Sequence, residues 1–325
     1  MVVMYSLEDL AQHLKDKHGL AVDQNQLQNL RNIGYYHGYK GYRFIRKASN
    51  KIEFENFSQV VALNNFDMEL KGLFYPLLMS LETALKSRVL EATLLECQTE
   101  SLSIIYQKGL TRYKECPASS DGYRKEFKRR MDLEIQITKA LTRDYMAGKA
   151  VATHFYNADR DIPIWAAFES LTLGEFGSFF ACCNKSIRMA VSKQLSLPTN
   201  LDGDGLVLKE IIFCLKDLRN AIAHNGIIFD TRFTTAKINK TIPKLLENAL
   251  QMTQIDFNYI VAYLALLCYM MKAIGEKPKN IASNINEYKK FSGMLKRLPQ
   301  NTSMKILGSQ DKKITDALTN FIIQA

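Results

Sequence analysis

The stretch LKEIIFCLKDLRNAIAHNG, residues 208–226, decides the fold class of this chain. Its apolar residues recur at the i, i+3, i+4, i+7 spacing that places side chains on one buried face of an α-helix. These residues are Leu208, Ile211, Ile212, Leu215, Leu218 and Ile222. The pair Asn225-Gly226 then predicts the helix end, because both residue types favour the backbone conformation that follows a helix. A long core helix is expected here, and similar patterns along the chain predict an all-α protein.

Three polar side chains stand at the end of this helix: Arg219, Asn220 and His224. At about 100° per residue, Arg219 lies about 40° from the centre of the apolar face at Leu215, so its guanidinium points toward the core. A permanently charged group in that position needs a carboxylate partner or an anionic ligand. Asn220 and His224 are one helical turn apart and share a face. His224 is about 140° further round than Arg219, so both reach one substrate only if the helix loosens after His224 or a second subunit contributes.

The same residues also have a purely structural interpretation. Arg219 would then form an internal ion pair, with Glu82 or Glu169 as its partner. His224 would be a cation favoured by the negative end of the helix dipole. The sequence leaves both interpretations open.

The composition favours a globular protein with a polyanionic partner. The chain has 325 residues, 47% of them hydrophobic, and a formal net charge of +10, a balance that favours nucleic acid as the partner. The six cysteines include no C-x-x-C pair and the histidines are not spaced with them as zinc ligands, so neither a metal nor another cofactor is expected. The chain does not open on a secretion signal, and its longest apolar run, residues 259–271, is too short to cross a bilayer. These features predict a protein of the reducing cytoplasm with no membrane attachment.

Helical patterns and their breaks divide the chain into three predicted parts. Residues 1–60 form a small N-terminal helical unit, residues 61–275 a helical bundle, and residues 276–325 a basic helical extension. Helices are expected at about 6–17, 23–33, 57–97, 123–147, 240–252, 255–274, 283–297 and 311–323. Two short core helices between residues 162 and 180 should meet at Gly174. Three segments are expected not to form regular helix: a connection at 98–121, the glycine-rich residues 34–44 and a hairpin at 42–54.

An aromatic and basic stretch is the first candidate surface for RNA. Residues 35–47 interleave aromatic rings with cations, the combination that stacks on bases and neutralises phosphates in single-stranded RNA. The candidate residues are Tyr35, Tyr36, Lys40, Arg43, Arg46 and Lys47. The alternative is that the tyrosines of this stretch pack the small unit onto the bundle.

A basic run on the helix expected at 123–147 is the second candidate. Its cations are Arg124, Lys125, Lys128, Arg129 and Arg130. They would bind a phosphate backbone electrostatically, although such a run is also typical of a solvated helix face. The lysines and arginines beyond residue 276 form a further candidate surface.

Several blocks of the sequence resemble the abortive-infection (Abi) proteins of the AbiD and AbiF type. The blocks are LRNIGYY (30–36), GYRF (41–44), NFDMEL (65–70), LETALK (81–86), PIW (163–165) and ESLTLG (169–174), and the resemblance covers roughly residues 5–270. Those proteins belong to the HEPN superfamily of helical bundles, many of which carry the ribonuclease motif Arg-x(4–6)-His. Arg219 and His224 match the shortest form of this motif. A second match, Arg31 to His37, crosses a turn rather than ending a long helix and is the weaker candidate.

The resemblance implies metal-independent endoribonuclease activity in bacterial antiphage defence. In that chemistry the 2′-OH of one nucleotide attacks its own 3′-phosphate and leaves a 2′,3′-cyclic phosphate. His224 would transfer the proton, Arg219 would stabilise charge on the phosphate, and Asn220 would orient a partner group. Since one motif supplies one histidine, two copies in a homodimer are expected. A small structured RNA or a protein antitoxin would restrain the toxicity.

Two other functions fit the same residues. The first is a non-catalytic RNA-binding module that keeps the HEPN fold and uses Arg219 structurally. The second, which fewer features support, is a DNA-binding regulator built on residues 1–60.

Overall fold

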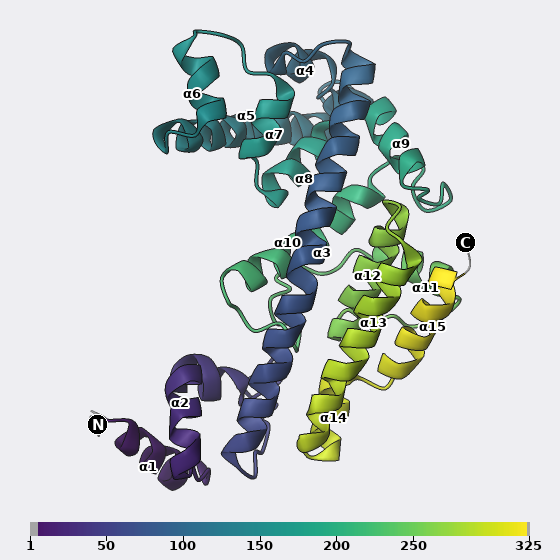
Figure 1. Ribbon diagram of the computed structural model, residues 1–325. Helices are drawn as coiled ribbons and strands as arrows, with labels where there is room; N and C mark the ends of the chain where they lie inside the picture. Colours follow the sequence, from purple (N-terminus) through teal and green to yellow (C-terminus); the bar gives the residue numbers. More distant parts are fainter. Residues whose placement is uncertain (1–5, 324–325) are drawn as a thin grey trace. The chain divides into compact units, whose positions relative to one another are not determined.

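The computed structural model describes residues 6–323, which form helices joined by connections, the longest of them at 41–56 and 224–240 (Figure 1). Within these residues there is no β-strand, and isolated bridges join only Phe44 to Lys51 and Ser101 to Pro163. The predicted all-α fold is therefore confirmed. Its more specific assignment as a HEPN-like bundle stays a prediction.

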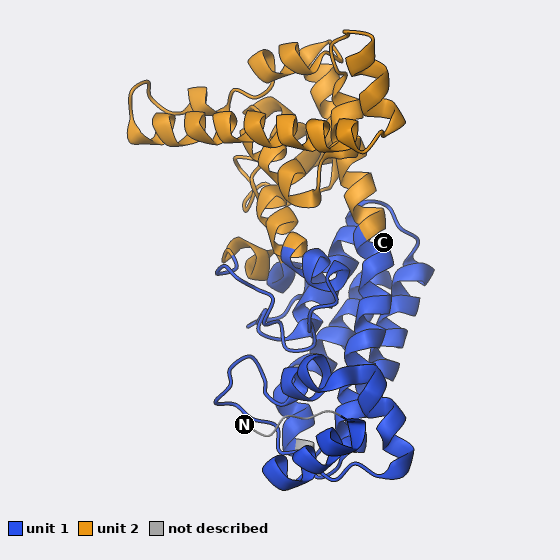
Figure 2. Cartoon of the chain, turned by 90° about the vertical axis from the view of Figure 1, so that its left-hand side faces the viewer, with its two compact units in different colours: residues 1–78, 217–238, 246–325 blue, residues 79–216, 239–245 orange. Residues whose placement is uncertain are grey.

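The chain forms two compact units, coloured separately in Figure 2. Within the described residues, the first unit takes the segment up to residue 78, residues 217–238 and the segment from 246 onward. The second unit takes residues 79–216 and 239–245. Helices α3 (Phe57–Cys97) and α10 (Val207–Ala223) each supply residues to both units. The predicted division of the chain at residues 60 and 275 stays a prediction.

The first unit begins with short helices that pack on the start of α3. They are α1 (Leu7–His18), η1 (Gln24–Gln26), α2 (Leu27–Ile33) and η2 (Gly34–Lys40). Ser6 caps α1 by accepting from the Asp9 amide, and Gly19 ends it at φ 65°, as the sequence predicts. Leu14, Leu30 and Phe57 belong to one buried apolar cluster, which fixes α1 and α2 against α3.

The glycine-rich segment after α2 forms a π-helical turn, η2 (Gly34–Lys40), in place of a regular α-helix. The hairpin expected at 42–54 is reduced to a tight turn without strands. Its backbone hydrogen bonds run from the Ile45 amide to the Asn50 carbonyl (2.9 Å) and from the Ile52 amide to the Arg43 carbonyl (2.8 Å). This turn brings residues 41–46 close to a distant part of the chain, described below.

The rest of the first unit is a group of helices from the C-terminal part of the chain. Helices α12 (Ile260–Ala273), α13 (Pro278–Ser292) and α15 (Asp311–Ile323) pack against one another (Figure 1). The 3₁₀ turn η4 (Gly293–Arg297), α14 (Gln300–Leu307) and residues 246–250 of α11 (Thr241–Leu250) complete the set, whereas residues 241–245 of α11 belong to the second unit. All side chains of α12 from 260 to 271 are buried, which explains the long apolar run in the sequence. No helix within residues 6–323 is both long and apolar enough to cross a bilayer.

The second unit contains the remaining helices. They are α4 (Leu102–Lys108), η3 (Arg112–Glu115), α5 (Asp121–Met146), α6 (Ala150–Asn157), α7 (Ile164–Ser170), α8 (Leu173–Cys182) and α9 (Lys185–Gln194). The expectation of a plain connection at 98–121 is wrong, because this segment contains α4 and η3. Ser101 caps α4, and Ile105 of α4 is buried in the core. Helices α7 and α8 meet at Leu171-Thr172 rather than at Gly174, because Thr172 and Glu175 form a capping box.

Candidate functional site

The end of helix α10 places the predicted catalytic residues at a surface. The helix ends at Ala223, the His224 amide donates to the Asn220 carbonyl (3.0 Å), and Asn225 takes a left-handed conformation with φ 52°. The end is therefore where the Asn-Gly pair predicts it. The apolar face is buried from Leu208 to Leu218 but only half-buried at Ile222, so the core ends within the last turn.

The three predicted catalytic side chains differ in their access to solvent. Asn220 and His224 are exposed, and Arg219 is half-buried. An exposed imidazole and amide one turn apart, with a guanidinium at the edge of the core, can reach a ligand that approaches the helix end. This arrangement matches the faces expected from the helical wheel. Whether these residues catalyse a reaction stays a prediction.

A buried carboxylate on α3 holds the loop that follows His224. Asp67 has an exposed fraction of 0%, and the apolar side chains one turn away on the helix, Leu63 and Leu70, are buried as well. Its Oδ1 accepts from the amides of Ile228 and Phe229, both at 2.8 Å. Its Oδ2 accepts from the hydroxyl of Tyr42 at 3.0 Å. One carboxylate thus ties α3 to the loop and to the turn after η2.

A buried lysine extends this connection to the residue next to His224. The ammonium of Lys71, which is 6% exposed, lies 2.8 Å from Asp67 Oδ2 and donates to Asn225 Oδ1 at 2.9 Å. A buried charge needs such partners, because removing it from water is costly. Since Asn225 directly follows His224 in the chain, the Asp67–Lys71 pair also restrains the backbone that carries the His224 side chain.

A second ion pair fixes the far end of the same loop. Arg232 pairs with the buried carboxylate of Asp230 (2.7 Å) and donates to the carbonyls of Gly41 (2.9 Å) and Phe44 (2.7 Å). A methyl group added at Gly41 would lie 2.6 Å from Ile227 Cδ1, so the turn and the loop are in close contact. Residues 41–46 therefore act as a support for the loop at 224–232.

Sequence reasoning missed four residues of this support: Asp67, Lys71, Asp230 and Arg232. The available signal was the position of Asp67 and Lys71, a carboxylate and a cation at i and i+4 on an apolar helix. The blocks GYRF and NFDMEL, which carry part of the resemblance, meet here through the bond of Tyr42 to Asp67. Burial and the neighbouring Asp67 raise the pKa of Tyr42 well above its usual value, so this phenol stays protonated as a donor.

The predicted RNA-binding stretch at 35–47 is divided between core and surface. Tyr35 is only 6% exposed, whereas the ring of Tyr36 is 77% exposed. Lys47 is exposed, and Lys40 and Arg43 are half-buried.

The remaining side chains of the stretch bind within the protein. Tyr39 and Tyr42 are buried, as the packing alternative expects. The guanidinium of Arg46 donates to the backbone carbonyls of Asp230 (3.2 Å) and Asn258. The accessible part of the stretch is thus narrower than its sequence indicates.

The predicted basic run lies on α5, in the second unit, and is also divided. Arg124, Lys125 and Lys128 are exposed. Arg129 is half-buried and pairs with a glutamate one turn earlier on the same helix. Arg130 lies over the ring of Tyr106, with its guanidinium carbon 3.9 Å from the ring centroid, and donates to the carbonyl of the same residue. Three of the five cations are therefore presented to solvent.

The second Arg-x-His match has a different setting. Arg31 lies on α2 and His37 on η2, with Gly34 at φ 76° between them, and both side chains are exposed. The ring of His37 makes an edge contact with Tyr42, with 6.5 Å between centroids. This match therefore crosses a turn, as expected from the sequence.

Comparisons with known proteins bear on the family alone. Curated proteins and solved structures give no match. A family model described as Abi-like protein matches residues 28–230, more than half of the chain. The matched range includes Asp67, Lys71 and the end of α10 with Arg219 and His224. The resemblance seen in the sequence is thereby confirmed, and the chain belongs to the Abi-like protein family.

Proposed function

We propose that this protein is a metal-independent endoribonuclease of bacterial antiphage defence, with Arg219, Asn220 and His224 as its catalytic residues. One observation carries the proposal. Asn220 and His224 are exposed one turn apart beside the half-buried Arg219, at a helix end whose loop is held by Asp67 and Lys71. Catalysis needs side chains held by rigid neighbours, and the ion pairs at this loop supply that rigidity.

The proposed reaction is an internal transesterification of RNA. The 2′-oxygen forms a bond to the adjacent phosphorus while the bond from phosphorus to the 5′-oxygen of the next nucleotide breaks. The imidazole of His224 accepts the 2′-OH proton, and the partner subunit's His224, as imidazolium, donates a proton to the departing 5′-oxygen. Arg219 stabilises the negative charge that grows on the phosphate, and Asn220 orients a partner group.

A homodimer is part of the proposal, because the motif supplies one imidazole whereas the reaction uses a base and an acid. The net charge of +10 favours RNA as the polyanion. The exposed residues Tyr36, Lys47, Arg124, Lys125 and Lys128 are the proposed contacts to its bases and backbone. The proposed setting is the cytoplasm, where a small structured RNA or a protein antitoxin restrains the activity.

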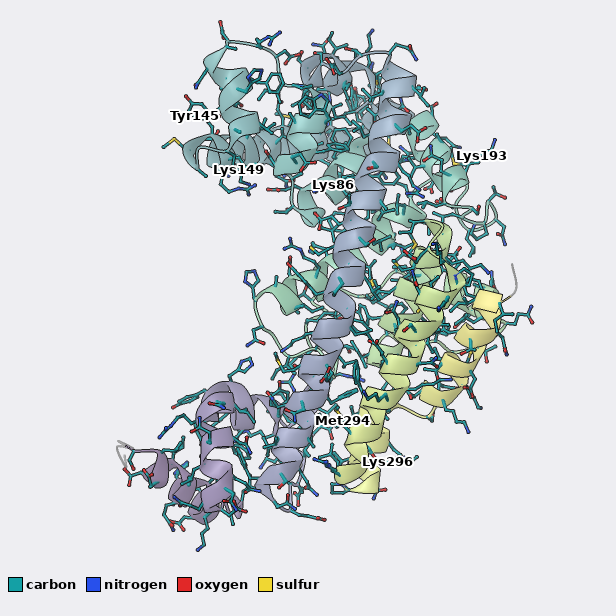
Figure 3. All side chains as sticks on the ribbon, in the orientation of Figure 1. Lys86, Tyr145, Lys149, Lys193, Met294 and Lys296 are labelled. Atoms are coloured by element: carbon teal, nitrogen blue, oxygen red, sulfur yellow. The ribbon has the colours of Figure 1, made fainter. Side chains whose placement is uncertain are left out.

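The test is cleavage of end-labelled RNA in the presence of EDTA. Wild type should give fragments ending in a 2′,3′-cyclic phosphate. His224→Gln should lower the rate by about 100-fold or more, the usual contribution of a general acid or base. Lys193→Gln, which changes an exposed side chain on α9 (labelled in Figure 3), is the control and should cleave like wild type.

Two results would replace the proposal. RNA that copurifies with the protein and stays intact, with equal and negligible cleavage by wild type and His224→Gln, would identify a non-catalytic RNA-binding module. Tighter binding of duplex DNA than of RNA at equal salt would identify a DNA-binding regulator. Circular dichroism of each variant ensures that lost activity is not lost folding.

A further inference from the structure

Two histidines and a tyrosine converge in the N-terminal part of the first unit, away from the α10 motif in the sequence. The Nε2 atoms of His13 and His18 lie 3.1 Å and 3.3 Å from the hydroxyl oxygen of Tyr35. The two imidazole centroids are 5.6 Å apart. Both histidines are half-buried, so the cluster reaches the surface.

The charge around this cluster is basic. The charged side chains that act most strongly on His18 are His13, Arg43, Lys40 and Lys51. The ammonium of Lys40 lies 5.2 Å from the centroid of the Tyr35 ring. Burial and these cations lower the pKa of His18, because each disfavours a further positive charge. An anion placed here would relieve the repulsion, whereas a metal cation would add to it.

An exposed ring lies beside the cluster. Tyr36 is 77% exposed, its ring makes an edge contact with Tyr35 at 5.2 Å between centroids, and the Lys40 ammonium is 5.9 Å from its centroid. A large solvated ring next to a group of cations is suited to stacking a base whose phosphate the cations bind. The two features together select a nucleotide over a simple anion.

We propose that His13, His18 and Tyr35 bind a backbone phosphate of single-stranded RNA, with the adjoining base stacked on Tyr36. The inference rests on the proposed function, since it assigns a substrate subsite to the same protein. It gives Tyr35 a role through its hydroxyl, as the ring is buried. It also adds two histidines that the basic and aromatic pattern of the sequence does not indicate.

The subsite has a defined dependence on pH. A bound phosphate stabilises the imidazolium form, so binding takes up a proton and affinity rises as pH falls. The other titratable or charged groups at the cluster are Tyr35, Tyr39, Lys40, Arg43 and Lys51. Histidine is the side-chain type whose charge ordinarily changes between pH 6 and 8, so the change in affinity over this range is assigned to the two histidines.

The experiment measures binding apart from cleavage. A fluorescent single-stranded RNA carrying 2′-O-methyl groups has no nucleophile for the reaction, and its anisotropy with the full chain gives Kd at pH 6 and pH 8. His13→Gln/His18→Gln should weaken binding about tenfold or more at pH 6, with a smaller change at pH 8. Tyr36→Ala, at an exposed position, should weaken binding about fivefold or more at both pH values.

Two variants keep the test decisive. Tyr35→Phe removes only the hydroxyl and should also weaken binding at pH 6, which covers the case in which the double variant does not fold. His154→Gln, an exposed histidine on α6, is the control and should bind like wild type.

The outcomes separate the subsite from the proposed function. Equal Kd values for wild type, Tyr35→Phe and Tyr36→Ala, with RNA still bound, would overturn the subsite and leave the nuclease proposal standing. The same holds if the pH dependence persists in a folded double variant. Absence of any RNA binding by wild type would overturn both, whereas lost cleavage in His224→Gln with unchanged Kd supports the nuclease proposal alone.

Discussion

Asp67→Ala is the substitution that most directly tests how the candidate site is supported. It removes the acceptor of hydrogen bonds from Tyr42, Ile228 and Phe229, and it leaves the 6% exposed ammonium of Lys71 without its carboxylate. Removing one partner of a buried ion pair costs about 3–5 kcal/mol, because the remaining charge stays buried. The two loop amides, if left unpaired, would each cost about 1–3 kcal/mol, but the loop can open to water and limit that cost. We therefore expect a loss of about 3–5 kcal/mol in the free energy of unfolding.

Urea unfolding followed by far-ultraviolet circular dichroism measures this loss. A second substitution, Lys71→Met, removes the orphaned charge while keeping an aliphatic side chain of similar length. Asp67→Ala/Lys71→Met should therefore be more stable than Asp67→Ala alone by about 1–2 kcal/mol. RNA cleavage should fall in Asp67→Ala at a temperature where the variant is still folded, because the backbone beside His224 is no longer held.

A loss of less than about 1 kcal/mol in Asp67→Ala, the value of a solvent-exposed pair, would contradict this expectation. Equal destabilisation by Lys71→Met in Asp67→Ala and in wild type would contradict it as well. Either result would mean that water reaches the pair and that the loop is held by other contacts.

Three further predictions concern stability, and each is checked by urea unfolding. Burial raises the pKa of Asp311 from 3.8 to about 6, and its carboxyl accepts a hydrogen bond from the Tyr288 hydroxyl. Between pH 4 and pH 6 the folded state therefore keeps a proton on Asp311 that the unfolded state has lost. The contribution of Asp311 to the free energy of unfolding is complete below pH 4 and declines by about 3 kcal/mol as the pH rises through 6. Asp311→Asn should abolish this decline, and parallel pH profiles for wild type and variant would contradict the assignment. Gly205→Ala should cost about 1–3 kcal/mol, because φ is 71° and the new methyl group would lie 2.6 Å from Arg188 Cβ; a neutral effect would mean that this segment shifts freely. Thr172→Ala should cost about 1 kcal/mol through the lost cap of α8, whereas Thr172→Ser should retain most of it.

Local sequence patterns predicted most of the helices of this protein, although not α4, α6, α9 or α14. The apolar spacing of residues 208–222 and the Asn-Gly pair after them predicted α10 and its end, and Ser6 with Gly19 predicted the limits of α1. These rules act between residues at most a few positions apart, so they can be applied to the sequence alone. At residues 98–121, Ser101 caps the short helix α4, which the sequence analysis did not predict.

Tertiary structure decided which polar residues meet and which are exposed. In the sequence, Asp67 is one of several charged residues on a long helix. In the structure its carboxylate accepts hydrogen bonds from the amides of Ile228 and Phe229, which lie 161 and 162 residues later in the chain. Tyr35 and Tyr36 are neighbours of the same type, but packing buries the first against α1 and leaves the second in solvent. Such contacts depend on how distant segments fold together, because a buried charge or ring is placed by all of its neighbours at once. Periodicity within one segment carries no information about them.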